Sequence, residues 1–272
     1  MKVAIQGVQG SFHHKVAQEF FIPEVPVAEC MSFPVLVDQL ITGQVTAAVM
    51  AIENSIAGAI LPNYALVNQY DLTIDGEYYL DVQHNLMGLP GQTIADIKEV
   101  WSHPMAHIQC RQFFQNYPDI KLVEDTDTAG VARQIQKEGL KGIGAIASVA
   151  ASQIYNLDII ASQIQTIKNN ETRFFILNTQ EKQIGDDCDK ASLCFTTDHK
   201  RGSLATILNV MSDCKLNLTK IQSMPIIETP WKYAFFVDIT FDVYTDYEKA
   251  KKILQIMATD FKVLGEYKNR KK

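Results

Sequence analysis

The chain has 272 residues, of which 47% are hydrophobic and 21% are charged, and its formal net charge is −6. These values are typical of a globular protein with one large domain or two smaller ones, and they exclude a disordered chain or a small disulfide-stapled scaffold. No stretch reaches the roughly 18 unbroken apolar residues that a membrane helix needs. The N-terminus also lacks the apolar core of a signal peptide, so we expect a cytoplasmic protein.

The five cysteines are odd in number, and no two of them are spaced as C-x-x-C. This pattern is typical of neither a disulfide framework nor a zinc site, so we expect free thiols and no metal.

Charge divides the chain in two. Residues 1–189 carry 11 Lys and Arg against 22 Asp and Glu, whereas residues 190–272 carry 14 against 9. This shift indicates two domains. An acidic chain without a basic amphipathic stretch gives no support to a nucleic acid or membrane partner, and the basic tail at 268–272 is typical of a solvated chain end.

Short apolar runs alternate with helical patterns at the start of the chain. We predict strands at 2–7, near 25–29 and at 46–54, and helices at 12–21 and 34–42, the second closed by Gly43. This alternation is typical of βα units, in which a parallel sheet carries helices on both faces.

A second set of elements follows the first. It comprises an extended segment at 73–88, strands at 99–103, 120–125 and 142–148, and helices at 104–116 and 128–138. Two α/β lobes of this kind suggest a cleft between them. The run TRFFILN at 172–178 is a candidate strand that returns to the first lobe and crosses the hinge.

The polar stretch at 179–190 is typical of a linker, and the pattern changes beyond it. We predict strands at 190–197, 218–227, 233–243 and 262–267, and helices at 202–215 and 247–259. The order βαββαβ is that of a ferredoxin-like α+β module.

Three strand-to-helix turns carry polar residues at which an anion could bind. The segment 7–11 (GVQGS) has neither the G-x-G-x-x-G spacing of a dinucleotide site nor the Gly-Lys-Ser/Thr of a P-loop, and a plain turn capped by Ser11 is the alternative. The segments 102–110 (SHPMAHIQC) and 126–130 (TDTAG) begin helices in the same way. In the second of these turns, His103 and His107 lack a third ligand at metal-site spacing, so metal binding is not expected.

Other polar residues allow more than one chemistry. The segment 52–58 (IENSIAG) follows a strand at the end where α/β folds bind ligands, with a polar turn as the alternative. No G-x-S-x-G marks a serine hydrolase, and nothing marks Cys110 as an activated thiol. Arg173 stands at the predicted lobe crossing, where its guanidinium could hold a carboxylate or form a surface salt bridge.

The ordered motifs GVQGSF, IENSIAG, SHPMAHIQC, DTAGVA and NETRF closely resemble those of the prephenate dehydratase family, and residues 190–272 resemble the ACT regulatory domain joined to it. The resemblance covers nearly the whole chain. It implies an α/β fold with a two-lobed, periplasmic-binding-protein-like catalytic domain over 1–180, followed by the ferredoxin-like ACT domain over 190–272. Lobe 1 is expected at about 1–80 plus 160–180 and lobe 2 at about 81–159, with no chorismate mutase domain before them.

The resemblance also implies an activity. A lyase of this family converts prephenate to phenylpyruvate in phenylalanine biosynthesis, without metal or organic cofactor. The alternatives are an arogenate dehydratase, whose substrate carries an amino group in place of the keto group, and a non-catalytic two-lobed small-molecule sensor. The intact E-N-S and T-R-F elements weigh against the sensor.

Site residues follow from the matched motifs. Thr172 matches the hydroxyl regarded in the family as essential for catalysis. The expected substrate-binding residues are Ser11, Glu53, Asn54, Ser55, Ser102, Gln109, Thr128, Arg173 and Phe174. Prephenate is a dianion that loses CO2 and expels a hydroxyl, and we expect Thr172 to donate to that hydroxyl. Arg173 either binds a carboxylate or braces its strand, and Glu53 either tunes Thr172 or is structural.

The ACT-like module is expected to bind an effector, L-phenylalanine. The expected contacts are Gly202, Ser203, Leu204, Ala205, Asn217, Leu218, Thr219 and Gln222. Where the family commonly has E-S-R-P, this chain has Gln222-Ser223-Met224-Pro225, which leaves the strength of phenylalanine inhibition open. ACT modules pair through their sheets, so a homodimer or homotetramer is expected.

Overall fold

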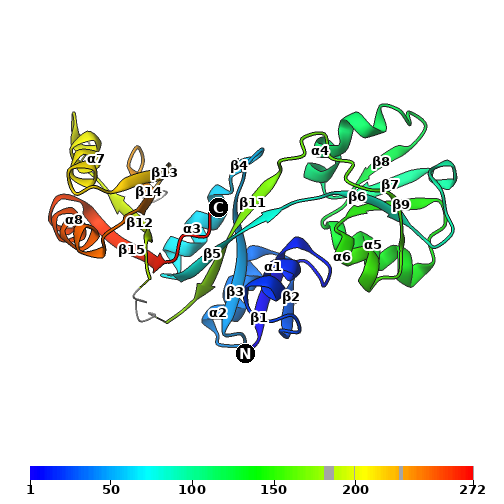
Figure 1. The fold of residues 1–272 in the computed structure, drawn as a ribbon, viewed down its shortest axis with the longest axis horizontal. Coiled ribbons are helices and arrows are strands. Elements are labelled where there is room, and N and C mark those ends of the chain that lie inside the picture. Colours follow the sequence, from blue (N-terminus) through cyan, green and yellow to red (C-terminus); the bar gives the residue numbers. More distant parts are fainter. Residues whose placement is uncertain (181–186, 199, 227–228, 272) are drawn as a thin grey trace. The chain divides into compact units, whose positions relative to one another are not determined.

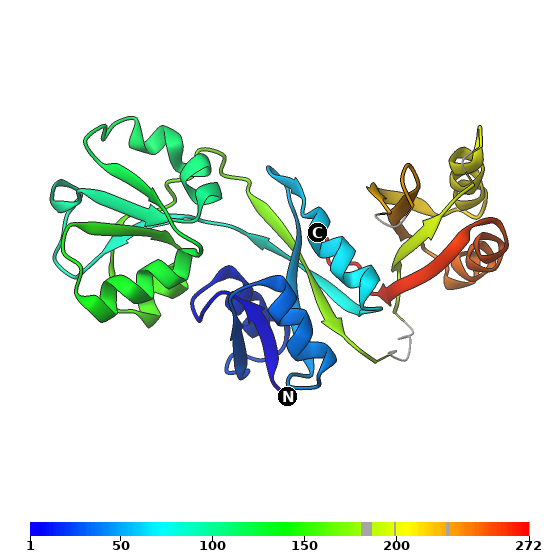
Figure 2. The ribbon, with the colours of Figure 1, turned by 180° about the vertical axis from the view of Figure 1, so that it is seen from behind.

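The computed structural model describes residues 1–180, 187–198, 200–226 and 229–271. It divides into two compact units, Met1–Gly58 with Tyr79–Phe174 and Ala59–Tyr78 with Phe175–Lys272. The strands β5 (Thr73–Asp81) and β11 (Glu171–Asn178) each run through a boundary between units, and they lie side by side in one sheet (Figures 1 and 2). Residues 181–186 of the predicted linker lie outside the described residues.

The first sheet is built from the predicted βα units. The strand β1 (Val3–Gln6) pairs in parallel with β2 (Val27–Cys30) and β3 (Ala47–Asn54), and the strand order is β2-β1-β3-β11-β5, with β4 (Gly58–Ala59) beside β3. The apolar run at 47–52 is buried, as expected for a sheet covered on both faces. Helices α1 (Phe12–Phe20) and α2 (Phe33–Ile41) begin at serine caps, Ser11 and Ser32.

The second lobe has a mixed sheet with the order β10-β6-β9-β7-β8. Its strands are β6 (Asn85–Gly88), β7 (Glu99–Ser102), β8 (Lys121–Glu124), β9 (Ile143–Ala147) and β10 (Asp158–Ala161). β7 is parallel to β8 and β9, whereas β6 is antiparallel to β9 and β10. Around it lie α4 (Pro104–Phe114), α5 (Thr128–Glu138), the short α6 (Val149–Ile154) and the 3-10 turn η1 (Ile94–Asp96).

The segment 73–88 differs from its prediction as one extended element of the second lobe. β5 ends at Asp81 in the first sheet, and β6 begins at Asn85 in the second sheet. The residues between them therefore cross from lobe to lobe beside the crossing that leads into β11. The amide N–H of Val82 donates to the carbonyl oxygen of Asn170 at 2.7 Å, which joins the two crossings.

The helix α3 (Leu61–Gln69) has no counterpart among the predicted elements. Its sequence LPNYALVNQ has no apolar stripe at helical spacing, and Ile60 gives it no side-chain cap. Tyr64 and Val67 are nevertheless buried, and the Tyr64 ring lies 5.2 Å from the ring of Phe236. Tertiary packing rather than local sequence stabilises this helix.

The second unit contains the predicted βαββαβ module. It comprises β12 (Lys190–Thr196), α7 (Ser203–Asp213), β13 (Asn217–Pro225), β14 (Tyr233–Thr240), α8 (Tyr244–Met257) and β15 (Thr259–Tyr267). The antiparallel strand order is β13-β14-β12-β15, and both helices pack on one face of the sheet (Figure 1). The predicted fold class, two α/β lobes followed by a ferredoxin-like module, is confirmed. The helix predicted at 247–259 begins earlier, at Tyr244, because Tyr244 and Tyr247 both pack against Phe241.

Two further features of the described residues match the sequence. All five cysteines are free thiols. None of the described helices combines the length and the apolar character that crossing a membrane would require.

A buried ion pair joins β12 to β5 within the second unit. The Lys190 ammonium donates to both carboxylate oxygens of Glu77 at 2.8 Å, and the two side chains are 3% and 0% exposed. The backbone N–H of Arg270 also donates to Glu77 at 3.2 Å. Nearby, a side chain at Gly265 would meet the carbonyl oxygen of Ile74 at 2.2 Å, so β15 and β5 approach closely.

Lys190→Met should destabilise the protein by about 3–5 kcal/mol, because it removes the ammonium that donates to both oxygens of the buried Glu77 carboxylate. The matched control is Lys262→Met, which breaks an exposed pair with Asp71 (2.6 Å) and should cost about 0–1 kcal/mol. Urea unfolding of both variants measures the difference. Equal losses of stability would contradict the assignment of Lys190 and Glu77 as a structural buried pair.

His13 should make stability depend on pH. Burial lowers the pKa of this imidazole to about 3, while its ring packs edge-on against Phe174 and its Nε2 accepts from the N–H of Ala51 at 3.3 Å. Below its ordinary pKa of 6.5 the unfolded chain gains a proton that the folded chain does not bind. Stability is therefore complete above about pH 6.5 and falls as the pH drops toward 3.

Urea unfolding at pH 7 and pH 4.5 tests this dependence. The wild type should lose about 2–3 kcal/mol more than His13→Gln over that interval. A parallel pH dependence in the two proteins would show that His13 is not the group that titrates.

Candidate active site

The site begins at a turn after β3. The side-chain oxygen of Asn54 accepts hydrogen bonds from the backbone N–H groups of Ile56 (3.0 Å) and Ala57 (2.9 Å). Two donors on this oxygen fix the orientation of the amide, so its NH2 group faces the opposite way.

The NH2 group of Asn54 reaches the start of β11. Its nitrogen lies 2.7 Å from Oδ1 of Asn170 and 2.9 Å from Oγ1 of Thr172. The next residues also pair, because Ser55 N–H donates to the carbonyl of Glu171 (2.8 Å) and Glu171 N–H donates to Oγ of Ser55 (3.0 Å). The E-N-S and T-R-F segments, far apart in the sequence, thus lie together.

The network continues into the second lobe. Asn170 Nδ2 donates to Oε1 of Gln109 on α4 at 3.0 Å, and the same oxygen lies 2.8 Å from Nε2 of His84. Asn54 contacts Thr172 directly, and Asn170 links both to Gln109, so three residues singled out from the sequence belong to one network. Asn170 and His84 are not among the predicted site residues, although Asn170 is the first residue of the NETRF motif.

Thr172 has a directed hydroxyl. Its oxygen accepts from Asn54, and among the described residues its hydrogen has no acceptor. The next two residues on β11 are buried: Arg173 is 4% exposed, with its guanidinium 5.9 Å from the centre of the Tyr79 ring, and Phe174 packs against His13. The two alternatives for Arg173, carboxylate binding and bracing of its strand, both stay predictions.

The three helix starts singled out as anion sites are closed by the protein's own side chains. Ser11 Oγ accepts from the N–H of His14 at 3.2 Å, and His103 Nδ1 accepts from Met105 at 3.2 Å. The Asp127 carboxylate accepts from Thr128 (2.8 Å) and Gly130 (2.9 Å). Burial raises the pKa of Asp127, while backbone donors, including Val8, oppose that shift. These contacts are those of ordinary N-caps, and roles for Ser11 and Thr128 in substrate binding stay predictions.

Ser102 ends β7 of the second lobe, and Glu53 directly precedes Asn54 on β3. The Ser102 hydroxyl is fully buried and donates to the carbonyl of Ile146 at 2.9 Å. Glu53 is half-buried at the end of β3. His107 donates from Nε2 to the carbonyl of Val123 at 2.9 Å, and in the described part of the chain no cluster of three His, Cys, Asp or Glu residues could hold a metal.

The glycine-rich loop makes close contacts with the second lobe. Gly10 has a φ of 86°, and a side chain there would meet Cα of Ala151 at 2.9 Å. Ser148 Oγ donates to the Gly10 carbonyl at 2.6 Å, and the Tyr155 hydroxyl donates to that of Gln9 at 2.6 Å. The glycine at position 10 therefore serves packing between lobes.

In the second unit, the predicted effector residues lie at the start of α7 and along β13. Gly202 precedes α7 with a φ of 82° and leaves the helix without a side-chain cap. Thr219 donates to the carbonyl of Asp238 at 3.1 Å, Asn217 to Thr240 Oγ1 at 3.4 Å, and Gln222 to the carbonyl of Ser223 at 2.9 Å. Their roles stay predictions.

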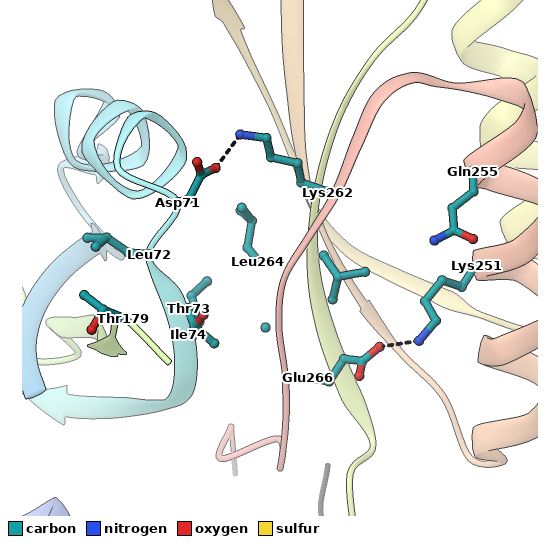
Figure 3. Close-up of a pocket in the computed structure, with 12 residues that line it drawn as sticks. Asp71, Leu72, Thr73, Ile74, Thr179, Lys251, Gln255, Lys262, Leu264 and Glu266 are labelled. Carbon is teal, nitrogen blue, oxygen red and sulfur yellow. Dashed lines mark hydrogen bonds and ion pairs between the residues drawn. The ribbon is translucent and has the colours of Figure 1, made fainter. Parts of the chain in front are cut away.

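A separate cavity of about 690 Å³ lies in the same unit, between β5 and the pair α8 and β15 (Figure 3). The described residues that line it include none of the predicted effector positions. Its lysines are paired with carboxylates, Lys262 with Asp71 at 2.6 Å and Lys251 with Glu266 at 2.9 Å, so it presents no surplus charge (Figure 3).

Known proteins resemble this chain over nearly its whole length. It is 34% identical over 278 residues to arogenate dehydratase/prephenate dehydratase 2, chloroplastic, of Arabidopsis thaliana, covering 98% of this chain and 72% of that protein. Among solved structures, one titled GqqA, a novel type of quorum quenching acylases, has a TM-score of 0.89 at 25% identity and 98% coverage of both chains. The prephenate dehydratase of Arthrobacter aurescens in complex with L-Phe shares the fold, with a TM-score of 0.87 at 22% identity, covering 99% of this chain and 90% of that one.

A family model adds the decisive match. The model described as prephenate dehydratase matches residues 3–182, which include the whole network from Asn54 to Thr172. The chain belongs to the prephenate dehydratase family.

Proposed function

We propose that this protein catalyses the decarboxylating dehydration of prephenate to phenylpyruvate. The observation that carries the proposal is the directed hydroxyl of Thr172, whose oxygen accepts from Asn54 at 2.9 Å and whose hydrogen is left for a ligand. Membership in the prephenate dehydratase family supplies the reaction class.

The reaction needs a donor at the leaving hydroxyl. The bond between the ring and its carboxylate breaks, the electron pair moves through the ring, and the opposite carbon–oxygen bond breaks. CO2 and hydroxide leave an aromatic product, and the hydroxide becomes water by taking a proton from the solvent. Thr172 donates its hydrogen bond to the departing hydroxyl. A threonine hydroxyl is a weak acid, and the N–H of Asn54 on its oxygen stabilises the negative charge that develops there.

The remaining contacts orient the dianion. The NH2 group of Gln109 has no partner among the described residues, and it donates to a substrate carboxylate or ring oxygen. Arg173 braces β11 behind Thr172, since its guanidinium is buried against Tyr79. One similar structure is titled an acylase, but acyl transfer through a Cys110 thiolate is disfavoured here, because burial raises the pKa of that thiol to about 12.

The domain roles complete the proposal. Residues 1–180 act as the catalytic domain and residues 190–272 as an ACT regulatory domain that binds L-phenylalanine and pairs with a second copy. The uncapped start of α7 at Gly202 offers backbone N–H groups to an amino acid carboxylate. Arogenate is the second candidate substrate, because the similar Arabidopsis protein carries both dehydratase names.

Thr172→Ala should lower kcat on prephenate by about 10²–10⁴-fold with a much smaller change in KM, because the lost hydrogen bond strengthens only in the transition state. Thr172→Ser keeps the hydroxyl and is the matched control. Phenylpyruvate formation measures both variants. An unchanged kcat in Thr172→Ala would remove Thr172 from the mechanism.

The substrate itself is tested by comparing turnover of prephenate and arogenate by the wild type. Robust formation of phenylpyruvate supports the proposal, and a preference for arogenate replaces the first substrate by the second. Tight binding of prephenate without turnover of either compound would favour a sensor.

L-Phenylalanine should inhibit the wild type more weakly than the double variant Gln222→Glu/Met224→Arg, which restores the family's charged pair on β13. A shift of the half-inhibiting concentration by at least about fivefold is expected for a coupling of ordinary strength. Initial rates over a phenylalanine titration give both values. An equal response would show that these two positions do not set the strength of inhibition.

A further inference from the structure

We propose that Asn170 and His84 are positioning residues of this site. They belong to a series of hydrogen bonds in which each donor and acceptor is fixed. This series leaves the NH2 group of Gln109 available as a donor and holds His84 in the tautomer protonated at Nε2. The inference deepens the proposed function and rests on it for its catalytic part. The tautomer itself follows from the geometry alone.

The donor-to-acceptor direction of this hydrogen-bond series is set at its first member, Asn54. Asn54 Oδ1 is occupied by two backbone N–H groups, from Ile56 and Ala57, which cannot reverse their role. Asn54 must therefore donate to Asn170, whose Oδ1 accepts at 2.7 Å. A reversed Asn54 amide would place its NH2 group against two backbone donors and its oxygen against the carbonyl of Glu171, which accepts from the present NH2 group at 3.3 Å.

Asn170 carries this direction across the lobes. It is fully buried, and since its oxygen accepts from Asn54, its NH2 group must donate to Gln109 Oε1 at 3.0 Å. The Gln109 oxygen is thereby fixed as an acceptor, and its NH2 group becomes the end that faces away from the network. The carbonyl of Asn170 also accepts from Val82 N–H, so the residue is held at both its backbone and its side chain.

The acceptor role of the Gln109 oxygen fixes the tautomer of His84. Its Nε2 lies 2.8 Å from the Gln109 oxygen, which accepts, so Nε2 carries the hydrogen. Nδ1 is then an unprotonated acceptor, and it is buried without a partner in the described part of the chain. Burial lowers the pKa of His84 and keeps the ring neutral, opposed by the bond to Gln109 and aided by the nearby His103. Its ring also packs edge-on against Phe12, 5.7 Å away.

The hydrogen-bond series strengthens the donors at its open ends. Two donors on one oxygen polarise the Gln109 amide and make its free N–H groups better donors. Both open ends of the network, the Thr172 hydroxyl and the Gln109 NH2 group, then offer hydrogens, which suits a dianion and a departing hydroxide. A buried acceptor without a partner, such as His84 Nδ1, destabilises the folded protein, and its retention is explained if the tautomer is needed.

Nitrogen-15 NMR of the full chain, labelled at its histidine rings, tests the tautomer. His84, assigned by its loss in His84→Gln, should show a protonated Nε2 and an unprotonated Nδ1. Two residues act as references in the same spectrum: His107, which donates from Nε2 to Val123, and His13, which accepts at Nε2 from Ala51. A wild-type His84 protonated at Nδ1 would overturn the proposal.

Asn170→Asp tests whether the direction is transmitted. Aspartate still accepts from Asn54 but cannot donate, so Gln109 should turn its NH2 group inward and the His84 hydrogen should move from Nε2 to Nδ1. The His107 signal should stay unchanged. A folded Asn170→Asp protein with the wild-type His84 tautomer would show that Asn170 does not set it.

Kinetics on prephenate test the catalytic part. His84→Gln places an amide N–H near the position of Nε2 and should keep kcat within about threefold, whereas His84→Met should lower kcat by up to about 100-fold with little change in KM. Equal kcat values for these two variants would overturn the positioning role. A correct tautomer in a protein that turns over neither prephenate nor arogenate would instead refute the proposed function and leave the network standing.

Discussion

The site depends on one amide, the side chain of Asn54. Its oxygen is held by two backbone N–H groups at the end of β3, so its nitrogen can only point toward β11. The bond that this nitrogen donates to the Thr172 oxygen follows from that orientation, and the pairing of Ser55 with Glu171 holds the same two segments together. A short turn thereby orients a side chain that contacts a strand more than a hundred residues later.

The lobes meet in a second place, and there the constraint is steric. Gly10 lies against Ala151, where a side chain would come within 2.9 Å of Cα, and two hydroxyls from the second lobe donate to carbonyls of the glycine-rich loop. The loop therefore packs against α6 and its neighbours. Polar atoms at a helix start do not by themselves make an anion site, since Ser11 and Asp127 already satisfy the helix ends.

Sequence reasoning recovered the elements whose patterns are local. Buried apolar runs and capped helices appear in the sequence as such, and the motifs around Asn54, Gln109 and Thr172 stand out from their surroundings. The segment 73–88 divides between two sheets without a change of pattern, and α3 has no apolar stripe. The roles of Asn170 and His84 could not be predicted for a different reason. Each is a single polar residue, and only the fold brings it near its partner Gln109.

The network around Thr172 consists of uncharged side chains, although the proposed substrate is a dianion. Residues 1–189 carry 22 acidic against 11 basic residues, and Arg173 on β11 is only 4% exposed. In the proposed function, the N–H and O–H groups of this network hold the anionic substrate. Such donors stabilise most strongly the atom on which negative charge develops during the reaction, because they are already oriented and need no reorganisation. A site of oriented amides therefore favours the departing hydroxide of the transition state over the delocalised charge of a bound carboxylate.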